Sequence, residues 1–460
     1  MRVTLVLTEA LAAQLAEAAS KPLENGGVLL ARVVQAGGQL RLLARRYFPV
    51  PPEHYELQAV DSLVIRSDGF VPALAAAEDD KAIAIWFHTH PGLDGAPYPS
   101  HHDERVDQVM ADTVRIRTNQ PYYATLIASP GRSGVLRFTG TLQSPDEIWP
   151  IERIWVVGEH FTLLPSASAP VPIPQKQFDR NVRAFGSGIQ SALGQMTFGV
   201  VGCGGTGSAV VEQLVRLGAR DFVLVDPKAL AESNVTRVYG STMEQVGLDK
   251  AAIARDHVLR IAPDAHVQTV TGSLTAKATA TTLVSCDVVF GCTDDEAGRL
   301  VLSRFSTYLL CPVIDCGVLI SSDSAGTIVG IDGRVTVLTP GAACLICRNR
   351  IDTALASAQM LPTHEYRLRQ GEGYAPALGN IEPAVITFTT AVAAASVTEL
   401  LERMISFGPE PRPSEVLLRI HEREISTNRA QPRQRHYCHP DSNKWGEGTG
   451  EPFLDLSWPS

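Results

Sequence analysis

The sequence is poor in cysteine, in positive charge and in long apolar runs, and each shortage excludes a class of protein. Only 8 of its 460 residues are cysteine, too few for a secreted disulfide framework. Its 40 lysines and arginines are outnumbered by 49 aspartates and glutamates, which gives a net charge of -9. This balance argues against a nucleic-acid partner.

The sequence also lacks the signals of a secreted or membrane protein. The amino terminus reaches Glu9 without a basic region followed by an apolar one, which predicts a cytoplasmic protein. The stretch from Pro383 to Leu401 is apolar, but it is rich in Thr, Ser and Ala and ends in acidic residues. We therefore predict a buried helix there and no membrane partner.

The length of the chain predicts more than one hydrophobic core. Residues 1–155 alternate apolar runs with helical patterns, which indicates an α/β domain. Residues 156–178 include the proline-rich stretch LLPSASAPVPIPQK and are predicted to be a linker. From Thr197 a strand, a glycine turn, a helix and the strand FVLVD follow in order. Residues 179–460 should therefore form a Rossmann-like domain with a mainly parallel sheet.

Two histidines and an acid in the first domain have the spacing of a metal site. His88 and His90 stand two apart at the end of an apolar strand, so both rings should point to the same side. Asp103 falls in the first turn of a predicted helix and can supply a third ligand. Two imidazoles, one carboxylate and an open position are typical of catalytic zinc. However, Ser100 and Asp103 also fit a plain helix capping box, and strand histidines can be ordinary surface residues.

In combination, this H-x-H-P motif and the following S-x-x-D resemble the signature of the JAMM/JAB (MPN) zinc metallopeptidases. The segment PLENGGVLLARV resembles that family's glutamate followed by a glycine-containing strand. The resemblance implies a zinc ion held by His88, His90 and Asp103. It also implies that Glu24 is a general base, which passes a proton from the attacking water to the leaving amine, and that Ser100 stabilises the oxyanion. His101 and His102 are expected to face solvent or substrate.

The second domain carries a glycine-rich turn, VVGCGGTGS, between a strand and a helix. Its glycines are Gly202, Gly204, Gly205 and Gly207. Backbone N–H groups in such a turn can approach phosphate, and the amino terminus of the helix favours negative charge. Asp226 ends the next strand, where an acid can bind ribose hydroxyls. These residues alone are compatible with NAD as well as with ATP.

The next segments resemble the ThiF/MoeB/HesA family of adenylating enzymes, which is related to the ubiquitin-activating enzymes. VDPKALAESNVTRVYG resembles the family's D-x-D-x-V-x-x-x-N-x-x-R-Q block, and VVFGCTDDEAGR matches its C-T-D-x-x-x-x-R segment. The resemblance implies ATP with Mg²⁺, bound by Asp226, Asn234, Arg237, Lys250 and Asp294. FDRNVRAFGSGIQSALGQ resembles the family's R-Y-x-R-Q helix. Arg183 would accordingly reach ATP across the interface of a homodimer.

The sequence departs from this family in three places. Lys228 stands where the family usually has a second aspartate, and Val238 replaces a glutamine. Between Cys347 and Glu382, where thioester-forming relatives carry a catalytic cysteine, the chain has none. We therefore do not expect a thioester on this chain. The thiols elsewhere in the domain are predicted to be packed rather than reactive: Cys203, Cys286, Cys292, Cys311 and Cys316.

A second zinc site is implied by Cys344 and Cys347, which match the first half of the family's structural zinc site. The second half should be another C-x-x-C, but only RHYCHPD is present. It supplies Cys438, with His436 or His439 as a possible fourth ligand. A site of three cysteines and one histidine is chemically sound.

Both resemblances imply one class of partner, a ubiquitin-like (β-grasp) protein with a carboxy-terminal glycine. We predict a bifunctional enzyme of a bacterial-type ubiquitin-like modification pathway. It would adenylate that glycine and cleave peptide or isopeptide bonds after it, with a conjugating-enzyme-like protein as a possible acceptor. One alternative is the processing and activation of a sulfur-carrier protein for sulfur transfer. A second is a non-catalytic scaffold that binds a ubiquitin-like partner.

Overall fold

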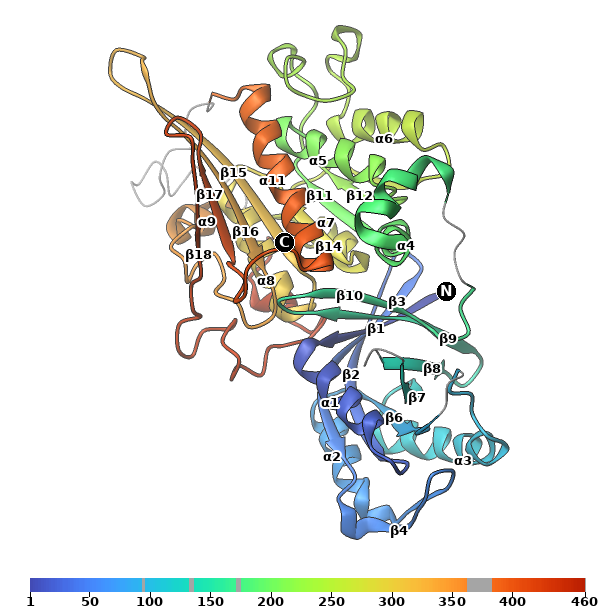
Figure 1. The fold of residues 1–460 in the computed structure, drawn as a ribbon. Coiled ribbons are helices and arrows are strands. Elements are labelled where there is room, and N and C mark those ends of the chain that lie inside the picture. Colours follow the sequence, from blue (N-terminus) through green and yellow to red (C-terminus); the bar gives the residue numbers. More distant parts are fainter. Residues whose placement is uncertain (93–95, 132–135, 171–174, 362–382, 460) are drawn as a thin grey trace. The chain divides into compact units, whose positions relative to one another are not determined.

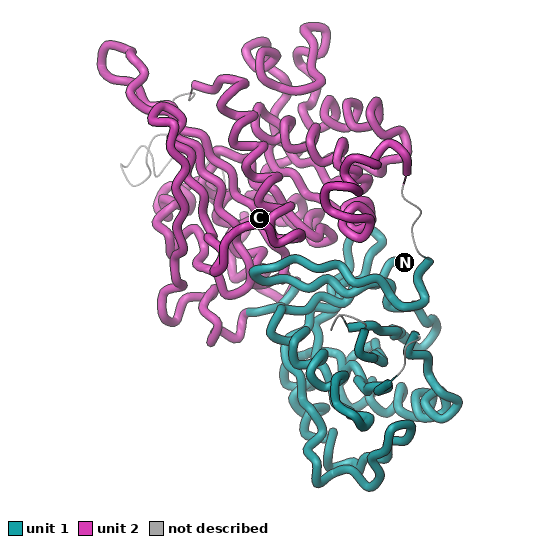
Figure 2. Tube along the Cα trace, viewed as in Figure 1, with its two compact units in different colours: residues 1–171, 445–448 teal, residues 172–444, 449–460 magenta. Residues whose placement is uncertain are grey.

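The computed structural model describes residues 1–92, 96–131, 136–170, 175–361 and 383–459. The chain forms two compact units (Figure 2). The first comprises Met1–Val171 and Trp445–Gly448, and the second comprises Pro172–Lys444 and Thr449–Ser460. Among the described residues, no helix is long and apolar enough to cross a membrane.

The first unit is a sheet that closes on itself. Its strands are β1 (Arg2–Thr8), β2 (Gly26–Ala36), β3 (Gln39–Pro49), β6 (Ile83–Thr89), β7 (Tyr123–Pro130), β8 (Leu136–Gln143), β9 (Ile148–Val157) and β10 (Phe161–Pro165). Their order is β1-β3-β2-β6-β7-β8-β9-β10, and a parallel ladder between β1 and β9 closes the ring. The strand β10 occupies part of the range predicted to be a linker, while residues 171–174 of that range lie outside the described residues.

Three helices and a small hairpin complete this unit (Figure 1). They are α1 (Glu9–Ser20), α2 (Val71–Asp79), α3 (His101–Thr118) and the pair β4 (Tyr55–Gln58) and β5 (Leu63–Ile65). One buried cluster contains α1 together with Leu42, Leu126 and Phe138. A second cluster joins α2 and α3 to the other side of the strands. The closed ring holds β6 next to β2, and thus fixes the end of β6 that carries His88.

The second unit is built around an eight-stranded sheet with the order β13-β12-β11-β14-β15-β16-β17-β18. The strands are β11 (Thr197–Val201), β12 (Asp221–Val225), β13 (His266–Val270), β14 (Val288–Gly291), β15 (Val313–Ser322), β16 (Ile328–Leu338), β17 (Glu415–Arg419) and β18 (Glu424–Asn428). The first five in this order pair in parallel, and the last three add antiparallel ladders. The sheet predicted to be mainly parallel is therefore a mixed sheet, in which five of the eight strands pair in parallel.

Helices pack on this sheet and connect its strands. They are α4 (Asp179–Gln195), α5 (Gly205–Arg216), α6 (Lys250–Ile261), α7 (Lys277–Thr282), α8 (Glu296–Tyr308), α9 (Thr353–Gln359) and α11 (Ile386–Ile405). The predicted buried helix corresponds to α11, which packs on β15 and β16 and against α5. Gly333 permits this close approach, because a side chain there would collide with Val392 of α11.

Candidate functional site

The glycine turn of the second unit leads from β11 into α5. Gly202 has a positive φ of 88°, which a residue with a side chain seldom adopts. A Cβ at Gly202 would lie 2.5 Å from the carbonyl oxygen of Cys292, and a side chain at Gly207 would collide with the carbonyl oxygen of Gly202. Gly204 precedes the first residue of α5 as its N-cap, without a side-chain capping bond. The turn therefore leaves N–H groups at the amino end of a helix, which is an arrangement that binds anions.

Asp226 fastens the end of β12 to this turn. Its Oδ2 atom accepts a hydrogen bond from the N–H of Cys203 at 2.8 Å, and its Oδ1 atom accepts one from the N–H of Lys228, also at 2.8 Å. Asp226 is 5% exposed. Each carboxylate oxygen keeps a second lone pair for a ligand hydroxyl, so the acid can support the turn and also contact a ribose.

The loop after β12 brings the side chain of Arg237 to the glycine turn. The Nη1 atom of Arg237 donates to the carbonyl oxygen of Ser233 at 2.8 Å. The Cδ atom of Arg237 lies 3.2 Å from where a Cβ of Gly205 would be. Asn234 holds the loop by accepting a hydrogen bond from the N–H of Ala231 at 3.2 Å. Arg237 is thus brought to the amino terminus of α5, and Asn234 holds the loop that carries it.

The other two predicted ATP ligands approach the same turn. Lys250 is the first residue of α6 and is 9% exposed. Its charge acts on the thiol of Cys203 in the glycine turn. Asp294 is exposed and follows Cys292 by two residues, and the carbonyl of Cys292 faces Gly202. The predicted cations and the acid are therefore carried by segments around the glycine turn, at the carboxyl ends of the parallel strands, where α/β folds bind ligands.

Arg183 is placed differently from these residues. It lies on α4, its side chain is 78% exposed, and it forms an ion pair with Asp179 at 2.9 Å. No contact among the described residues joins it to the glycine turn of its own chain. Its predicted role across a dimer interface stays a prediction.

Residues that the sequence did not single out complete the turn. The N–H of Tyr239 donates to Ser208 of α5 at 3.0 Å, and its hydroxyl lies 3.1 Å from that of Thr390 in α11. The Oγ1 atom of Thr389 lies 3.1 Å from where a Cβ of Gly205 would be. Because α11 begins 181 residues after the turn, only the folded chain reveals these contacts.

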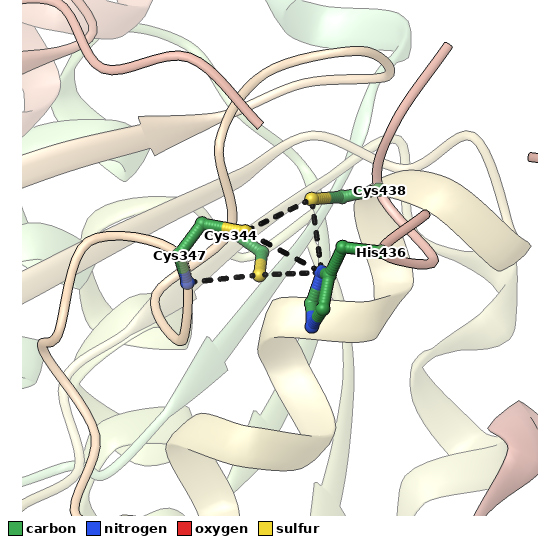
Figure 3. A group of neighbouring side chains, drawn as sticks. All are labelled: Cys344, Cys347, His436 and Cys438. Carbon is green, nitrogen blue, oxygen red and sulfur yellow. Dashed lines mark hydrogen bonds between the residues drawn. The ribbon is translucent and has the colours of Figure 1, made fainter. Parts of the chain in front are cut away.

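A group of three cysteines and one histidine lies in the same unit (Figure 3). It contains Cys344, Cys347, His436 and Cys438, whose ligand atoms all lie within 4.8 Å of one another. The Nδ1 atom of His436 is 3.5, 3.4 and 3.2 Å from the three sulfurs, and the sulfurs of Cys347 and Cys438 are 3.7 Å apart. Zinc–sulfur bonds of about 2.3 Å in a tetrahedron place sulfurs about 3.8 Å apart. The four residues therefore fit a structural zinc ion.

This geometry distinguishes the two histidines that the sequence left open. His436 faces the sulfurs, whereas the Nδ1 atom of His439 accepts a hydrogen bond from the N–H of Asp441 at 3.2 Å. Hydrogen bonding from Cys438 lowers the pKa of Cys344 to about 5, in spite of burial. A thiolate at neutral pH is the form that binds zinc.

We expect His436→Ala to weaken zinc binding by at least about 10–100-fold, the range seen when only a supporting residue is lost. The measurement is zinc release to a colorimetric chelator from the full chain. His439→Ala is the matched control and should release zinc as slowly as the unchanged protein. Equal release from both variants, or faster release from His439→Ala alone, would show that His436 is not the fourth ligand.

The first unit holds a second possible metal group, formed by His88, His90 and Asp103. The Nε2 atom of His88 lies 3.4 Å from Oδ1 of Asp103, and the Nε2 atom of His90 lies 3.8 Å from Oδ2. His88 is 4% exposed, and within the described residues its buried Nδ1 atom has no hydrogen-bond partner. A buried imidazole of this kind suits a metal ligand, so the three side chains fit a cation.

Glu24 lies beside this group and is 7% exposed. Its Oε1 atom is 3.8 Å from the Nε2 atom of His90. Burial raises the pKa of its carboxyl to about 7, although the nearby His88 opposes the shift. The side chain of Gln58 and the carbonyl of Ala59 hold the backbone of Glu24 through hydrogen bonds of 2.9 Å. The predicted general base is thus within reach of the predicted ligands.

Ser100 and Asp103 do form a capping box at the start of α3. The N–H of Asp103 donates to Ser100 Oγ at 3.2 Å, and the N–H of Ser100 donates to Asp103 Oδ2 at 2.7 Å. Burial alone would raise the pKa of Asp103, but the His88 ring and the bonds from Ser100 hold it below its usual range. Both sequence interpretations therefore apply to Asp103, because it caps the helix and also faces the histidines.

Three other residues of α3 differ in their surroundings: His101 and His102 are exposed, and Asp107 is held by a hydrogen bond. The exposure of the two histidines is as expected. Asp107, which the sequence analysis did not select, accepts a hydrogen bond from the buried Tyr123 hydroxyl at 3.1 Å. Burial raises the pKa of Asp107 to about 6. Its place one helical turn after Asp103 is the signal that could have indicated it.

Comparison with known proteins identifies the second unit. A model described as "ThiF family" matches residues 178–440, more than half of the chain. The Escherichia coli K12 molybdopterin-synthase adenylyltransferase is 28% identical over 172 residues, which is 37% of this chain and 65% of that protein. The sulfur carrier protein ThiS adenylyltransferase of the same organism is 27% identical over 141 residues, covering 31% of this chain and 52% of that protein. The chain therefore belongs to the ThiF family.

The matched region is less than two thirds of the length of these curated relatives. Among solved structures, that of E. coli MccB with ATP covers 58% of this chain and 75% of that chain, with 14% identity and a TM-score of 0.45. The residues that the ThiF family model matches all lie in the second unit.

Proposed function

We propose that the second unit uses ATP to adenylate the carboxy-terminal glycine of a small sulfur-carrier or ubiquitin-like protein. The observation that carries this proposal is the glycine turn at the start of α5 with the side chain of Arg237 packed beside Gly205. The names of the ThiF-family relatives support the substrate class, since they include a molybdopterin-synthase adenylyltransferase and a ThiS adenylyltransferase.

The chemistry follows from the charges at the turn. The N–H groups at the start of α5 bind phosphate oxygens, while Arg237 and Lys250 offset the negative charge. Asp294 would hold Mg²⁺, which neutralises charge on the phosphates. With the glycine carboxylate held in line, its oxygen bonds to the α-phosphorus, the bond to the bridging oxygen breaks, and pyrophosphate leaves with the electron pair. The product is an acyl-adenylate.

The described thiols near the turn are poor nucleophiles. Burial raises the pKa of Cys203 above the usual range of a thiol. A hydrogen bond with Cys316, together with burial, raises that of Cys292. Because the thiolate is the reactive form of cysteine, we infer that no thioester forms on these cysteines. The acyl group would instead pass to water, to a sulfur donor or to a conjugating-enzyme-like protein. Residues 362–382 of the cysteine-free segment lie outside the described residues.

The direct test is intact-mass analysis of a candidate carrier ending in Gly-Gly after incubation with this protein, ATP and Mg²⁺. We expect the mass of its acyl-adenylate, and no change in a carrier whose last glycine is deleted. Tight binding of the carrier without formation of an adenylate would instead indicate that the protein is a non-catalytic scaffold. A homodimer that shares Arg183 between its sites is part of this proposal.

A second activity is favoured by the group in the first unit. We propose that this unit is a zinc peptidase that cleaves after the same terminal glycine, with His88, His90 and Asp103 as ligands. A zinc ion held there would act as a Lewis acid and make water a stronger nucleophile. Glu24, with its raised pKa, accepts a proton at a carboxylate oxygen and returns it to the leaving amine. The Ser100 hydroxyl lies at the same helix end and can donate to a developing oxyanion.

We expect the full chain to hold about two zinc ions and His88→Ala combined with Asp103→Ala to hold about one, because the two proposed sites are separate. Elemental analysis of the purified full chain measures this. The double variant His101→Ala plus His102→Ala is the matched control, since its histidines are adjacent but exposed, and it should keep both ions. Unchanged zinc in the His88 and Asp103 variant would remove the metal from the first unit.

A further inference from the structure

Two thiols lie side by side at the end of the parallel half of the second sheet. Gly291 of β14 pairs with Asp315 of β15 in a parallel ladder, so the next residues along each chain, Cys292 and Cys316, are neighbours whose side chains share one face. The thiol of Cys316 donates to the carbonyl oxygen of Ile314 at 3.6 Å. Cys316 is 5% exposed and Cys292 is half-buried.

The backbone spacing there permits a covalent bond. Neighbouring strands lie about 4.7–4.9 Å apart, which is within the Cα separation of about 4.4–6.8 Å found across disulfides. To form the bond, the Cys316 thiol would leave the carbonyl of Ile314 and the two sulfurs would approach to about 2.05 Å.

Cys292 is also part of the wall of the glycine turn. Its N–H donates to the carbonyl oxygen of Val201 at 2.8 Å, and its own carbonyl oxygen faces Gly202. A Cβ at Gly207 would lie 3.3 Å from the Cβ atom of Cys292. Asp294 follows two residues later. A disulfide that draws Cys292 toward β15 would therefore displace the glycine turn. It would also displace the backbone that carries Asp294, the proposed Mg²⁺ ligand.

We propose that Cys292 and Cys316 are a modification site, at which a hydroperoxide forms a reversible disulfide that disables the nucleotide turn. In the first step one thiol loses its proton, and its sulfur takes the distal oxygen of the hydroperoxide to give a sulfenic acid and an alcohol, or water from hydrogen peroxide. In the second step the other sulfur displaces hydroxide from the sulfenic sulfur, and its proton leaves with that hydroxide as water. The two thiols are oxidised by two electrons and the peroxide is reduced by two.

The surroundings set the speed and the reversibility of this reaction. Because Cys316 is buried and Cys292 is half-buried, peroxide has little access to either thiol, so oxidation should be slow and should need sustained peroxide. A bond between parallel strands departs from relaxed disulfide geometry, and such strain makes a disulfide easier to reduce. Dithiothreitol should therefore restore the thiols. The effect on ATP chemistry rests on the proposed function, whereas formation of the bond does not.

The test is peptide mapping of the native full chain after treatment with hydrogen peroxide, with free thiols blocked and no reductant added. We expect a linked pair of peptides containing Cys292 and Cys316, which disappears after dithiothreitol. Cys316→Ala should form no such pair, and Cys203→Ala, which removes a buried neighbouring thiol, should still form it. Native unlinked thiols after treatment, or a link that appears only in urea, would overturn the proposal.

Measuring pyrophosphate exchange distinguishes this proposal from the adenylation proposal. Oxidation should lower pyrophosphate exchange at least about tenfold in the unchanged protein, reversibly, and leave Cys316→Ala unaffected. If the linked peptides form and exchange persists, the disulfide does not act on the turn and the regulatory part is wrong. If no exchange occurs even in the reduced protein, the adenylation proposal fails while the mapped disulfide stands.

Discussion

Asp294→Ala should abolish carrier-dependent exchange of pyrophosphate into ATP, lowering its rate by roughly 10²–10³-fold or more. Asp294 is the exposed acid beside the glycine turn, and the removal of its carboxylate takes away the proposed Mg²⁺ ligand while the turn keeps its backbone contacts. The measurement is incorporation of labelled pyrophosphate into ATP with a Gly-Gly carrier. The peptidase activity proposed for the first unit should be unchanged.

Asp323→Asn is the matched control, because Asp323 is an exposed acid in the turn between β15 and β16. It should exchange at the unchanged rate. If Asp294→Ala kept more than about a tenth of the activity with an unaltered melting temperature, Asp294 would not hold the metal that the reaction needs.

The same assay tests the homodimer. Arg183→Ala alone should lose exchange if this exposed arginine completes the site of a second copy. Mixed dimers of Arg183→Ala with Asp294→Ala should regain part of the activity, because one of their two composite sites keeps both residues. Failure to regain any activity in dimers proved to be mixed would place Arg183 outside the partner's site.

Glu24→Gln should lose roughly 10²–10⁴-fold of the cleavage rate, the usual contribution of a general base, and should keep its zinc. The amide has the shape of the carboxylate but accepts no proton at neutral pH. Hydrolysis of a carrier extended beyond its terminal glycine measures the rate, and elemental analysis measures the metal.

Glu56→Gln serves as the control for this substitution, since Glu56 is an exposed acid on β4, the strand that lies close to the Glu24 backbone. Its turnover should match that of the unchanged protein. Full turnover by Glu24→Gln would remove Glu24 from the mechanism, and loss of zinc together with turnover would make it a ligand rather than a base.

The sequence predicted those parts of the site in which a local pattern sets the geometry. The glycines and Asp226 lie in one strand–turn–helix–strand unit, so their contacts follow from local backbone rules. His88 at the end of β6 and His90 directly after the strand lie on the same side for the same reason, with ring centroids 5.1 Å apart. The ThiF-family assignment of the second unit is confirmed.

Contacts between segments that are far apart in the sequence could not be predicted from local sequence patterns. The choice of His436 over His439 depends on how the last residues approach the Cys344 loop, since both histidines flank Cys438 closely in sequence. Thr389 meets Gly205 only because α11 packs on α5. The β1–β9 ladder, which joins residues about 150 apart, closes a sheet that the alternating pattern predicted only as α/β.

The central claim is that the second unit activates a carboxy-terminal glycine at the glycine turn. Carrier-dependent pyrophosphate exchange by the full, reduced chain tests it most directly, with ATP, Mg²⁺ and carriers ending in Gly-Gly or lacking the last glycine. We predict exchange with the intact carrier and none with the shortened one or without a carrier. Equal exchange with both carriers, or binding of the intact carrier with no exchange at all, would contradict the account.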